Sequence, residues 1–360
     1  MLNSMYYHLL LTQRCNLACT YCGGSREEAE HPEVEYSVED LRRFLAQDPE
    51  PVLVFYGGEP LLRAELLMEI MDTIPAGYML HTNGLLLRRL GESYLRRFRT
   101  ILVSIDGRPE VTDRYRGAGV YRRVLDNLRW LRRRFEGDLI ARMVASLSTD
   151  IYEDVLHLAN LHLFDHVHWQ LDFELFWDGG SEASRRWLRR YNAGISKLVG
   201  FWVEEMRAGR VHGLVPFIGI MHTLLTGEPA GLRCGAGVEF FAIAPNGDIT
   251  LCPVTPEYGF MRVGSIFTTS PESLRNCASL GEPCRSCDIL EVCGGRCLFI
   301  NLAKDWVGDE GYAMICSTVR HLVAELEAAA PEVRRLLEKG AIPEEAFSYA
   351  EVHNDCEVVP

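Results

Sequence analysis

Residues 6–22 read YYHLLLTQRCNLACTYC, an apolar stretch that leads directly into three cysteines. The composition of Tyr6–Thr12 is typical of a short buried strand. The cysteines that follow, Cys15, Cys19 and Cys22, have the spacing C-x3-C-x2-C on a single loop. Three thiolates placed in this way can hold three irons of a [4Fe–4S] cluster and leave the fourth iron open, because thiolates are the soft ligands that such clusters prefer.

A zinc site is the alternative interpretation of this loop. Structural zinc is normally held by four ligands. The loop contains no fourth cysteine or histidine, and the nearest candidate downstream is His31. The residues therefore favour the cluster over zinc.

Strand-like and helix-like stretches alternate along the first half of the chain. The strand candidates are short, apolar or β-branched, and bounded by glycine, proline, asparagine or aspartate. They are Tyr6–Thr12, Val52–Tyr56, Tyr78–Thr82, Thr100–Ile105, Leu139–Leu147 and His166–Leu171. The expected helices are Val38–Gln47, Leu61–Thr73, Leu86–Phe98, Tyr121–Phe135 and Ile151–Leu161, then a long helix at Glu182–Arg207 and a last one near Ser317–Leu337.

Six such units in succession predict an α/β fold with parallel strands, either a partial TIM-like (β/α)6 barrel or an open doubly wound sheet. In both arrangements function gathers at the carboxyl ends of the strands. Gly57-Gly58-Glu59-Pro60, Asn83-Gly84 and Asp106-Gly107 each follow a strand, and Ser104 ends one. Loops of this kind are rich in turn residues in any case, but their recurrence at one edge predicts a shared pocket.

A second group of cysteines occupies the C-terminal part. None of the twelve cysteines lies between positions 23 and 233, and nine lie from position 234 onward. In a reducing compartment such a pattern indicates metal binding or catalysis more than disulfides. The regularly spaced residues are Cys234, Gly247, Cys252, Cys284, Cys287, Cys293, Cys297 and Cys316. A zinc ribbon would use close pairs of cysteines and leaves several of these unexplained. Asn246-Gly247, between two apolar runs, predicts a β-hairpin.

The N-terminal motif, C-x3-C-x-aromatic-C after a first strand, resembles the signature of the radical S-adenosylmethionine (SAM) superfamily. The resemblance implies that SAM binds the open iron and that Tyr21 lies beside its adenine. The segment Gly57, Gly58, Glu59 and Pro60 resembles the GGEP motif of that family, in which Glu59 would bind the methionine amine. A carboxylate suits an ammonium partner, and glycines let the backbone approach a ligand closely.

Four further residues are expected near SAM by the same resemblance. Ser104 belongs to Ser-Ile-Asp-Gly, which resembles the family's S-x-D-G and would contact the ribose or carboxylate. Asn83 ends the third strand, Arg116 follows the Asp-Gly turn, and Gln170 lies on the sixth strand. Three of them also have an ordinary explanation: Ser104 as a strand end, Arg116 as a surface charge, and Gln170 as an outward-facing side chain.

The C-terminal pattern resembles the SPASM extension of many peptide-modifying radical SAM enzymes, matched at seven cysteines and Gly247. The resemblance implies two auxiliary [4Fe–4S] clusters, and three clusters in all. The inner cluster would use Cys234, Cys252 and Cys297. The outer cluster would use Cys284, Cys287, Cys293 and Cys316.

The inner set departs from the pattern. Several relatives supply a fourth inner ligand from a cysteine shortly before the position of Cys234, and residues 226–233 contain none. The inner cluster then either keeps an open iron or recruits Cys277 or Cys356. We favour bystander thiols for both. The expected domains are a radical SAM core at 1–210, a SPASM domain at 211–320, and a C-terminal helix and tail at 321–360.

Composition excludes several function classes. The net charge of −13 and the lack of a long basic run argue against a nucleic-acid partner. No apolar run reaches the roughly 18 residues that a membrane span needs. The N-terminus lacks the basic region and cleavage site of a signal peptide. We therefore expect a cytoplasmic protein, and the oxygen-sensitive clusters imply an anaerobic host.

The resemblance extends to archaeal radical SAM/SPASM enzymes assigned to peptide modification, through the motifs above and Tyr115–Gly117. It implies SAM cleavage to a 5′-deoxyadenosyl radical and crosslinking or oxidation of a side chain in a ribosomally made peptide or protein. The implied partners are that precursor and a flavodoxin- or ferredoxin-like electron donor. Only fourteen residues precede Cys15, so we expect no leader-binding domain and recognition through a separate protein, another surface, or a leaderless substrate.

Three other functions stay open. Anaerobic sulfatase-maturating enzymes share this architecture but carry an aspartate base after the cysteine that matches Cys252, where this chain has Pro253. Asp172 or Glu174 could replace that base, although an exposed loop acid is the commoner explanation. A small-molecule alcohol oxidase is the second alternative. A non-enzymatic iron–sulfur electron-transfer protein is the third, and the GGEP and S-x-D-G motifs count against it.

Overall fold

The structure is a computed structural model that describes residues 4–22, 30–176, 179–254, 257–348 and 360. It contains two compact units. The first unit is formed by Met1–Ile105, Thr112–Ile140 and Gly235–Ser279, and the second by Asp106–Val111, Ala141–Cys234 and Leu280–Pro360.

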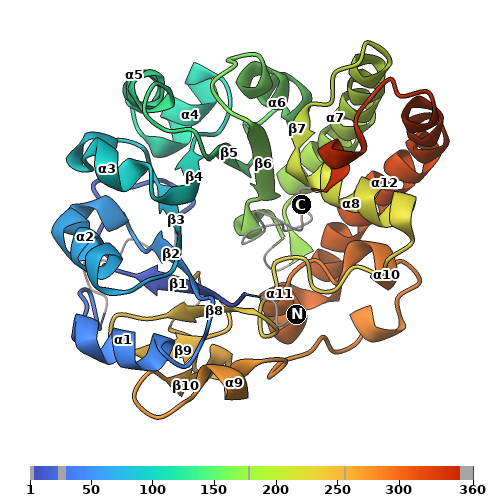
Figure 1. The fold of residues 1–360 in the computed structure, drawn as a ribbon. Helices are drawn as coiled ribbons and strands as arrows, with labels where there is room; N and C mark the ends of the chain where they lie inside the picture. The colour runs from blue at the N-terminus through green and yellow to red at the C-terminus, as the bar shows by residue number, and fades with distance from the viewer. Residues whose placement is uncertain (1–3, 23–29, 177–178, 255–256, 349–359) are drawn as a thin grey trace. The chain divides into compact units, whose positions relative to one another are not determined.

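Parallel strands form the centre of the first unit. β1 pairs with β2, β2 with β3 and β3 with β4, all in parallel. On its other edge β1 pairs in parallel with β8, and β8, β9 and β10 continue as antiparallel neighbours (Figure 1). The strands are β1 (Tyr6–Leu10), β2 (Val52–Tyr56), β3 (Gly77–Thr82), β4 (Phe98–Ser104), β8 (Phe240–Ile243), β9 (Asp248–Thr250) and β10 (Arg262–Ser265).

Helices α1, α2 and α3 lie side by side along β1–β4 in Figure 1. The first of them begins with a capping box, in which Ser37 and Asp40 exchange side-chain and backbone hydrogen bonds. The helices of this unit are α1 (Val38–Leu45), η1 (Pro60–Arg63), α2 (Ala64–Thr73), η2 (Leu87–Arg89), α3 (Glu92–Leu95), α5 (Val120–Arg132), η5 (Gly259–Met261) and α9 (Pro271–Leu274). Helix α4 (Pro109–Arg116) and strand β5 (Asp138–Ala145) cross the boundary between the units.

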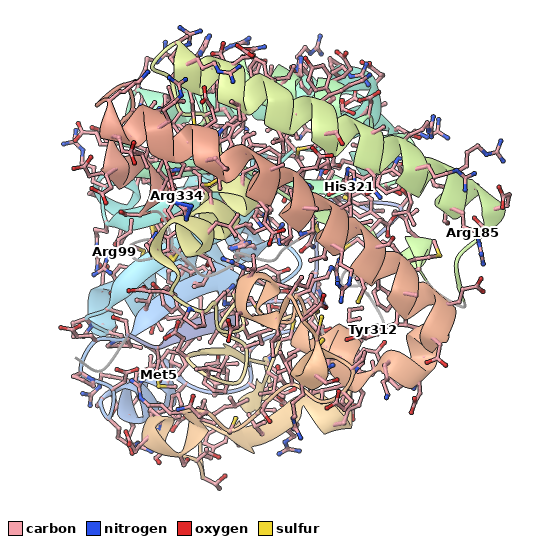
Figure 2. The ribbon with its side chains drawn as sticks, turned by 90° about the vertical axis from the view of Figure 1, so that its right-hand side faces the viewer. Met5, Arg99, Arg185, Tyr312, His321 and Arg334 are labelled. Carbon is pink, nitrogen blue, oxygen red and sulfur yellow. The ribbon has the colours of Figure 1, made fainter. Side chains whose placement is uncertain are left out.

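The second unit is mainly helical. Its long helices α7 and α12 lie side by side in Figures 1 and 2, and Ser196 Oγ of α7 lies 3.0 Å from His321 Nε2 of α12. Strand β6 pairs in parallel with β7. The elements are α6 (Ile151–Ala159), β6 (His166–Leu171), η3 (Phe173–Leu175), α7 (Glu182–Arg207), β7 (Gly213–Leu214), α8 (Val215–Thr226), η6 (Cys284–Ser286), α10 (Leu290–Cys293), α11 (Leu298–Leu302), α12 (Lys304–Glu338) and η7 (Glu344–Phe347).

The α/β fold with parallel strands is confirmed. Strands β2 and β6 and helix α7 have the expected bounds. The single helix expected at Leu86–Phe98 is wrong: the chain forms η2 and α3, separated by Gly91 in an extended conformation. The domain boundaries expected at 210 and 320 stay a prediction. None of the described helices is long and apolar enough to cross a membrane.

Candidate active site

The cysteine loop follows β1 in the first unit. Its backbone makes a turn in which the Cys22 N–H donates to the Cys19 carbonyl at 3.0 Å. The Thr20 N–H donates to the Tyr115 carbonyl at 3.0 Å, which ties the loop to α4. Cys22 is exposed, whereas Cys15 and Cys19 are partly buried. Burial raises the pKa of the Cys15 thiol.

Two glycines bring the loop after β2 against the cysteine loop. The Gly58 N–H donates to the Thr12 carbonyl at 2.8 Å, and the Glu59 N–H donates to the Arg14 carbonyl at 2.9 Å. A Cβ atom on Gly57 would lie 2.2 Å from the Thr12 oxygen, and one on Gly58 would lie 2.2 Å from the Arg14 oxygen. Gly57 also has a φ of +129°. Only glycine allows this approach, so the Gly-Gly pair fixes one loop upon the other.

Glu59 is fully buried and caps η1, which begins with Pro60. Its Oε1 accepts hydrogen bonds from the Leu61 N–H at 3.1 Å and the Thr82 hydroxyl at 2.8 Å. Its Oε2 accepts the Asn83 N–H at 2.8 Å. Burial raises the pKa of the Glu59 carboxyl to about 7, against the lowering effect of these bonds. The carboxylate thus joins the ends of β2 and β3, and its contact with a methionine amine stays a prediction.

Asn83 links the end of β3 to the cysteine loop. Its side-chain amide donates to Asn16 Oδ1 at 2.7 Å and lies 3.7 Å from the Cys15 sulfur. Its own Oδ1 accepts the Leu85 N–H at 3.0 Å, which orients the amide. The structure therefore brings Glu59 and Asn83 together beside Cys15. Sequence reasoning missed Asn16 and Thr82, which no motif marks.

Tyr21 lies between two residues of α4. Its ring centroid is 5.5 Å from that of Tyr115 and 5.5 Å from the Arg116 guanidinium carbon. Arg116 is 7% exposed, so it is not the surface charge of the alternative interpretation. A cation held near an aromatic ring is attracted by the ring quadrupole, and this contact orients Tyr21.

The two remaining expected SAM contacts lie in different units. Ser104 is the last residue of β4 and is partly exposed in the first unit. Gln170 lies on β6 in the second unit, where its Oε1 accepts a hydrogen bond from Arg142 at 2.6 Å. Their roles toward SAM stay predictions.

The second unit holds a cavity lined by cysteines. The thiols at its wall are Cys284, Cys287, Cys293, Cys297 and Cys316. Four of them are the set expected for the outer cluster. Burial is the largest cause that raises the pKa of Cys316 to about 11, and neighbouring cysteines add to it. The other lining residues include no histidine or carboxylate.

Residues 9–161 match the model of the radical SAM superfamily. This part of the chain is a radical SAM domain. An uncharacterized protein of Archaeoglobus fulgidus is 24% identical over 320 residues, which cover 79% of this chain and 72% of that protein. A PqqA peptide cyclase of Rhodopseudomonas palustris is 26% identical over 331 residues, covering 82% of this chain and 83% of the cyclase. The expected resemblance to an archaeal protein and to a peptide-modifying enzyme is confirmed.

Among solved structures, native anSMEcpe with bound AdoMet and the Cp18Cys peptide is similar to this chain with a TM-score of 0.73. The two sequences are 19% identical, and the match covers 94% of this chain and 100% of that chain. The likeness shows that the fold of the radical SAM domain and of the segment after it is shared.

The ligand set expected for the inner cluster spans both units. Cys252 belongs to the first unit, and Cys234 and Cys297 to the second, so their grouping stays a prediction. Cys277 is exposed in the first unit, and Cys356 lies outside the described residues.

Asp172 and Glu174, which follow β6, are the two candidate bases. Asp172 is 7% exposed and accepts a hydrogen bond from the Ser146 hydroxyl at 2.7 Å, so it is not an exposed loop acid. The side chain of Glu174 lies outside the described part of the chain.

The potential iron ligands of the N-terminal loop and of the cavity wall are all cysteine thiols. This is the donor chemistry of [4Fe–4S] clusters. Within the described ranges, no group of three or more histidine, cysteine, aspartate or glutamate side chains stands where it would hold a single metal ion. Because their sulfurs are the ligands that such clusters use, the cysteines of the radical SAM domain fit a cluster in their chemistry, and Asn83 Nδ2 lies 3.7 Å from the Cys15 sulfur.

Proposed function

We propose that this protein is a radical SAM enzyme that cleaves SAM reductively and modifies a side chain of a ribosomally made peptide or protein. The observation that carries the proposal is the junction of Cys15, Glu59 and Asn83 at the ends of three adjacent parallel strands. Cys15, Cys19 and Cys22 would hold the first [4Fe–4S] cluster. When bound, this cluster would supply the electron for reductive cleavage of SAM and, through it, hydrogen abstraction from the substrate.

The chain's own residues orient and enclose this site. Asn83 donates toward the Cys15 sulfur and fixes Asn16. Glu59 holds the backbone of Asn83 in place. Arg116 holds the ring of Tyr21, which is available for stacking against adenine. Because these contacts exist within the protein itself, the site is oriented in advance and ligand binding orders few side chains.

The auxiliary sites complete the proposal. Cys284, Cys287, Cys293 and Cys316 would hold an outer cluster in the cavity of the second unit. Cys234, Cys252 and Cys297 would hold an inner one. Such clusters would take up the electron released when a side chain is oxidised, or bind the substrate.

The proposed substrate class is supported by the substrates named for similar proteins. One of them is named a PqqA peptide cyclase, and the solved structure of anSMEcpe contains a bound peptide. We infer that a peptide is also the substrate here, with crosslinking or oxidation of a side chain as the outcome. The partners would be an electron donor of the flavodoxin or ferredoxin class and, where the precursor carries a leader, a separate leader-binding protein.

Release of 5′-deoxyadenosine tests the first step. The anaerobically reconstituted protein is mixed with SAM and dithionite, and the product is measured by chromatography. We expect release by the natural protein, none by Cys19→Ala, and release unchanged by Cys277→Ala, which removes an exposed thiol elsewhere. A fully iron-loaded protein that releases none, even with peptides encoded by neighbouring genes, contradicts the enzyme and favours an electron carrier.

Mass spectrometry of the same peptides tests the substrate class. Loss of hydrogen from a peptide, dependent on SAM and abolished by Cys19→Ala, supports side-chain oxidation or crosslinking. Oxidation of small alcohols, but not of the peptides encoded by neighbouring genes, would favour the alcohol oxidase. Oxidation of a sulfatase peptide alone would favour the sulfatase-maturating enzyme.

A further inference from the structure

We propose that Tyr312 and Arg320 are positioning residues that raise the reduction potential of the outer auxiliary cluster, through hydrogen bonds to the sulfurs of Cys284 and Cys287. The inference rests on the proposed function, since it requires a cluster on these cysteines. It adds two residues that no cysteine motif includes.

The first support is their place on α12. Tyr312, Cys316 and Arg320 follow one another at intervals of four residues. Side chains so spaced lie on one face of an α-helix, one turn apart. Tyr312 is labelled on α12 in Figure 2, and all three residues line the same cavity. The helix thus presents a cluster ligand with one polar side chain on each side of it.

The second support is the contact of Tyr312. Its hydroxyl oxygen lies 3.0 Å from the Cys284 sulfur. The same oxygen accepts a hydrogen bond from Asn301 Nδ2 at 3.2 Å. Asn301 is buried and is itself fixed by Gly281, whose N–H donates to Asn301 Oδ1 at 2.6 Å. Because a thiolate ligand can only accept, the Tyr312 hydroxyl must donate to the sulfur when Cys284 binds iron.

The third support is the contact of Arg320. Its Nη2 donates to the Cys287 sulfur at 3.2 Å. The guanidinium is held by Asp288, which accepts a hydrogen bond from Nη1 at 3.1 Å and a second one from Nη2. The side chains of Arg320 and Asp288 are 46% and 73% exposed. An ion pair so exposed contributes little to folding stability, and its clear structural effect is to aim the guanidinium at the sulfur.

These contacts have a defined electrostatic consequence. Reduction adds negative charge to a cluster and its sulfurs. Hydrogen bonds to the sulfurs and a nearby positive charge stabilise the reduced form more than the oxidised form. The cavity also contains Arg296 as a second cation. Loss of Tyr312 or Arg320 should therefore make the outer cluster harder to reduce.

Redox titration with dithionite, followed by electron paramagnetic resonance, tests this on the anaerobically reconstituted full chain. The variants are Arg320→Gln and Tyr312→Phe. The matched control is Arg335→Gln, because Arg335 also lies on α12, is also 46% exposed and also pairs with a carboxylate. In each variant we expect the midpoint potential of one cluster signal to fall. The fall should correspond to at least a tenfold change in the oxidised-to-reduced ratio, which is about 59 mV for one electron. The control and the other signals should not move.

Signals that stay in place in both variants, with iron and sulfide content unchanged, overturn the inference and leave the proposed function intact. If the natural protein lacks any signal that Cys284→Ala or Cys316→Ala removes, no outer cluster is bound. The inference and the proposed outer site are then both wrong, whereas SAM cleavage at the first site is judged by 5′-deoxyadenosine release. Should Arg320→Gln lose the cluster, Arg320→Lys keeps the charge without the forked geometry, and its potential should still fall. A potential that falls in neither Arg320→Lys nor Tyr312→Phe then overturns the inference.

Discussion

Glu59→Gln gives the most direct test of the junction beside the cysteine loop. The natural side chain accepts three hydrogen bonds, two on Oε1 and one on Oε2. A glutamine offers only one acceptor oxygen. In its better orientation the new NH2 group faces the Asn83 N–H, so one buried donor loses its partner. Such a loss costs about 1–3 kcal/mol of unfolding free energy.

The effect of Glu59→Gln on the unfolding free energy should also depend on pH. Burial raises the pKa of the Glu59 carboxyl from 4.5 to about 7. Between these values the unfolded chain has released its proton and the folded chain has kept it, so stability falls as the pH rises. Each unit of pKa difference corresponds to about 1.4 kcal/mol, so Glu59 should remove roughly 2 kcal/mol of stability between about pH 5.5 and about pH 8. Glutamine does not titrate and lacks this slope.

Denaturant unfolding at both pH values, followed by tryptophan fluorescence under anaerobic conditions, measures the effect. We expect Glu59→Gln to be about 1–3 kcal/mol less stable than the natural protein at the lower pH, and the difference to shrink by roughly 2 kcal/mol at the higher one. Glu65→Gln, on the exposed side of α2, is the control and should change stability by less than about 0.5 kcal/mol. An equal difference at both pH values would refute the buried-carboxyl reasoning.

Two further predictions concern the side-chain hydrogen bonds of two other buried residues, Asn83 and Asp154. Asn83→Ala removes the amide that fixes Asn16, and we expect roughly fivefold to tenfold slower 5′-deoxyadenosine release, which a time course under saturating SAM measures. Unchanged release would contradict the role of this amide. Asp154→Ala removes a fully buried carboxylate that Arg108 binds at 2.8 Å, and unfolding free energy should fall by about 2–4 kcal/mol. Asp126→Ala, at an exposed site, should leave that free energy nearly unchanged.

Several elements could be predicted because their signals are local. Val52–Tyr56 and His166–Leu171 are short β-branched or aromatic runs, and they form strands with those bounds. The hairpin at Asn246-Gly247 also forms, between β8 and β9. The helix expected near Ser317–Leu337 instead extends from Lys304 to Glu338, across a non-helical Gly308 that interrupts the pattern. Glycine weakens a helical signal in the sequence even where neighbouring turns pack well.

Other elements were missed for identifiable reasons. Helix α8 is buried on nearly every side, so its sequence has no polar face that would mark it as amphipathic. Helix α4 begins at Pro109, and proline in the first turn was an available signal. The parallel pairing of β8 with β1 joins residues more than 200 positions apart, and no local pattern predicts it.

The sequence by itself determined which chemical groups the candidate site contains. Cys15, Cys19 and Cys22 lie within eight residues, and Gly57, Gly58 and Glu59 are consecutive. Over such short stretches the spacing along the chain limits how far apart the side chains can lie. Only the tertiary structure decided which distant side chains contact the cysteines. Asn83 approaches Cys15 from 68 positions away, and Arg320 approaches Cys287 from 33 positions away. Such contacts depend on how strands and helices pack, and a single sequence carries no local record of that packing.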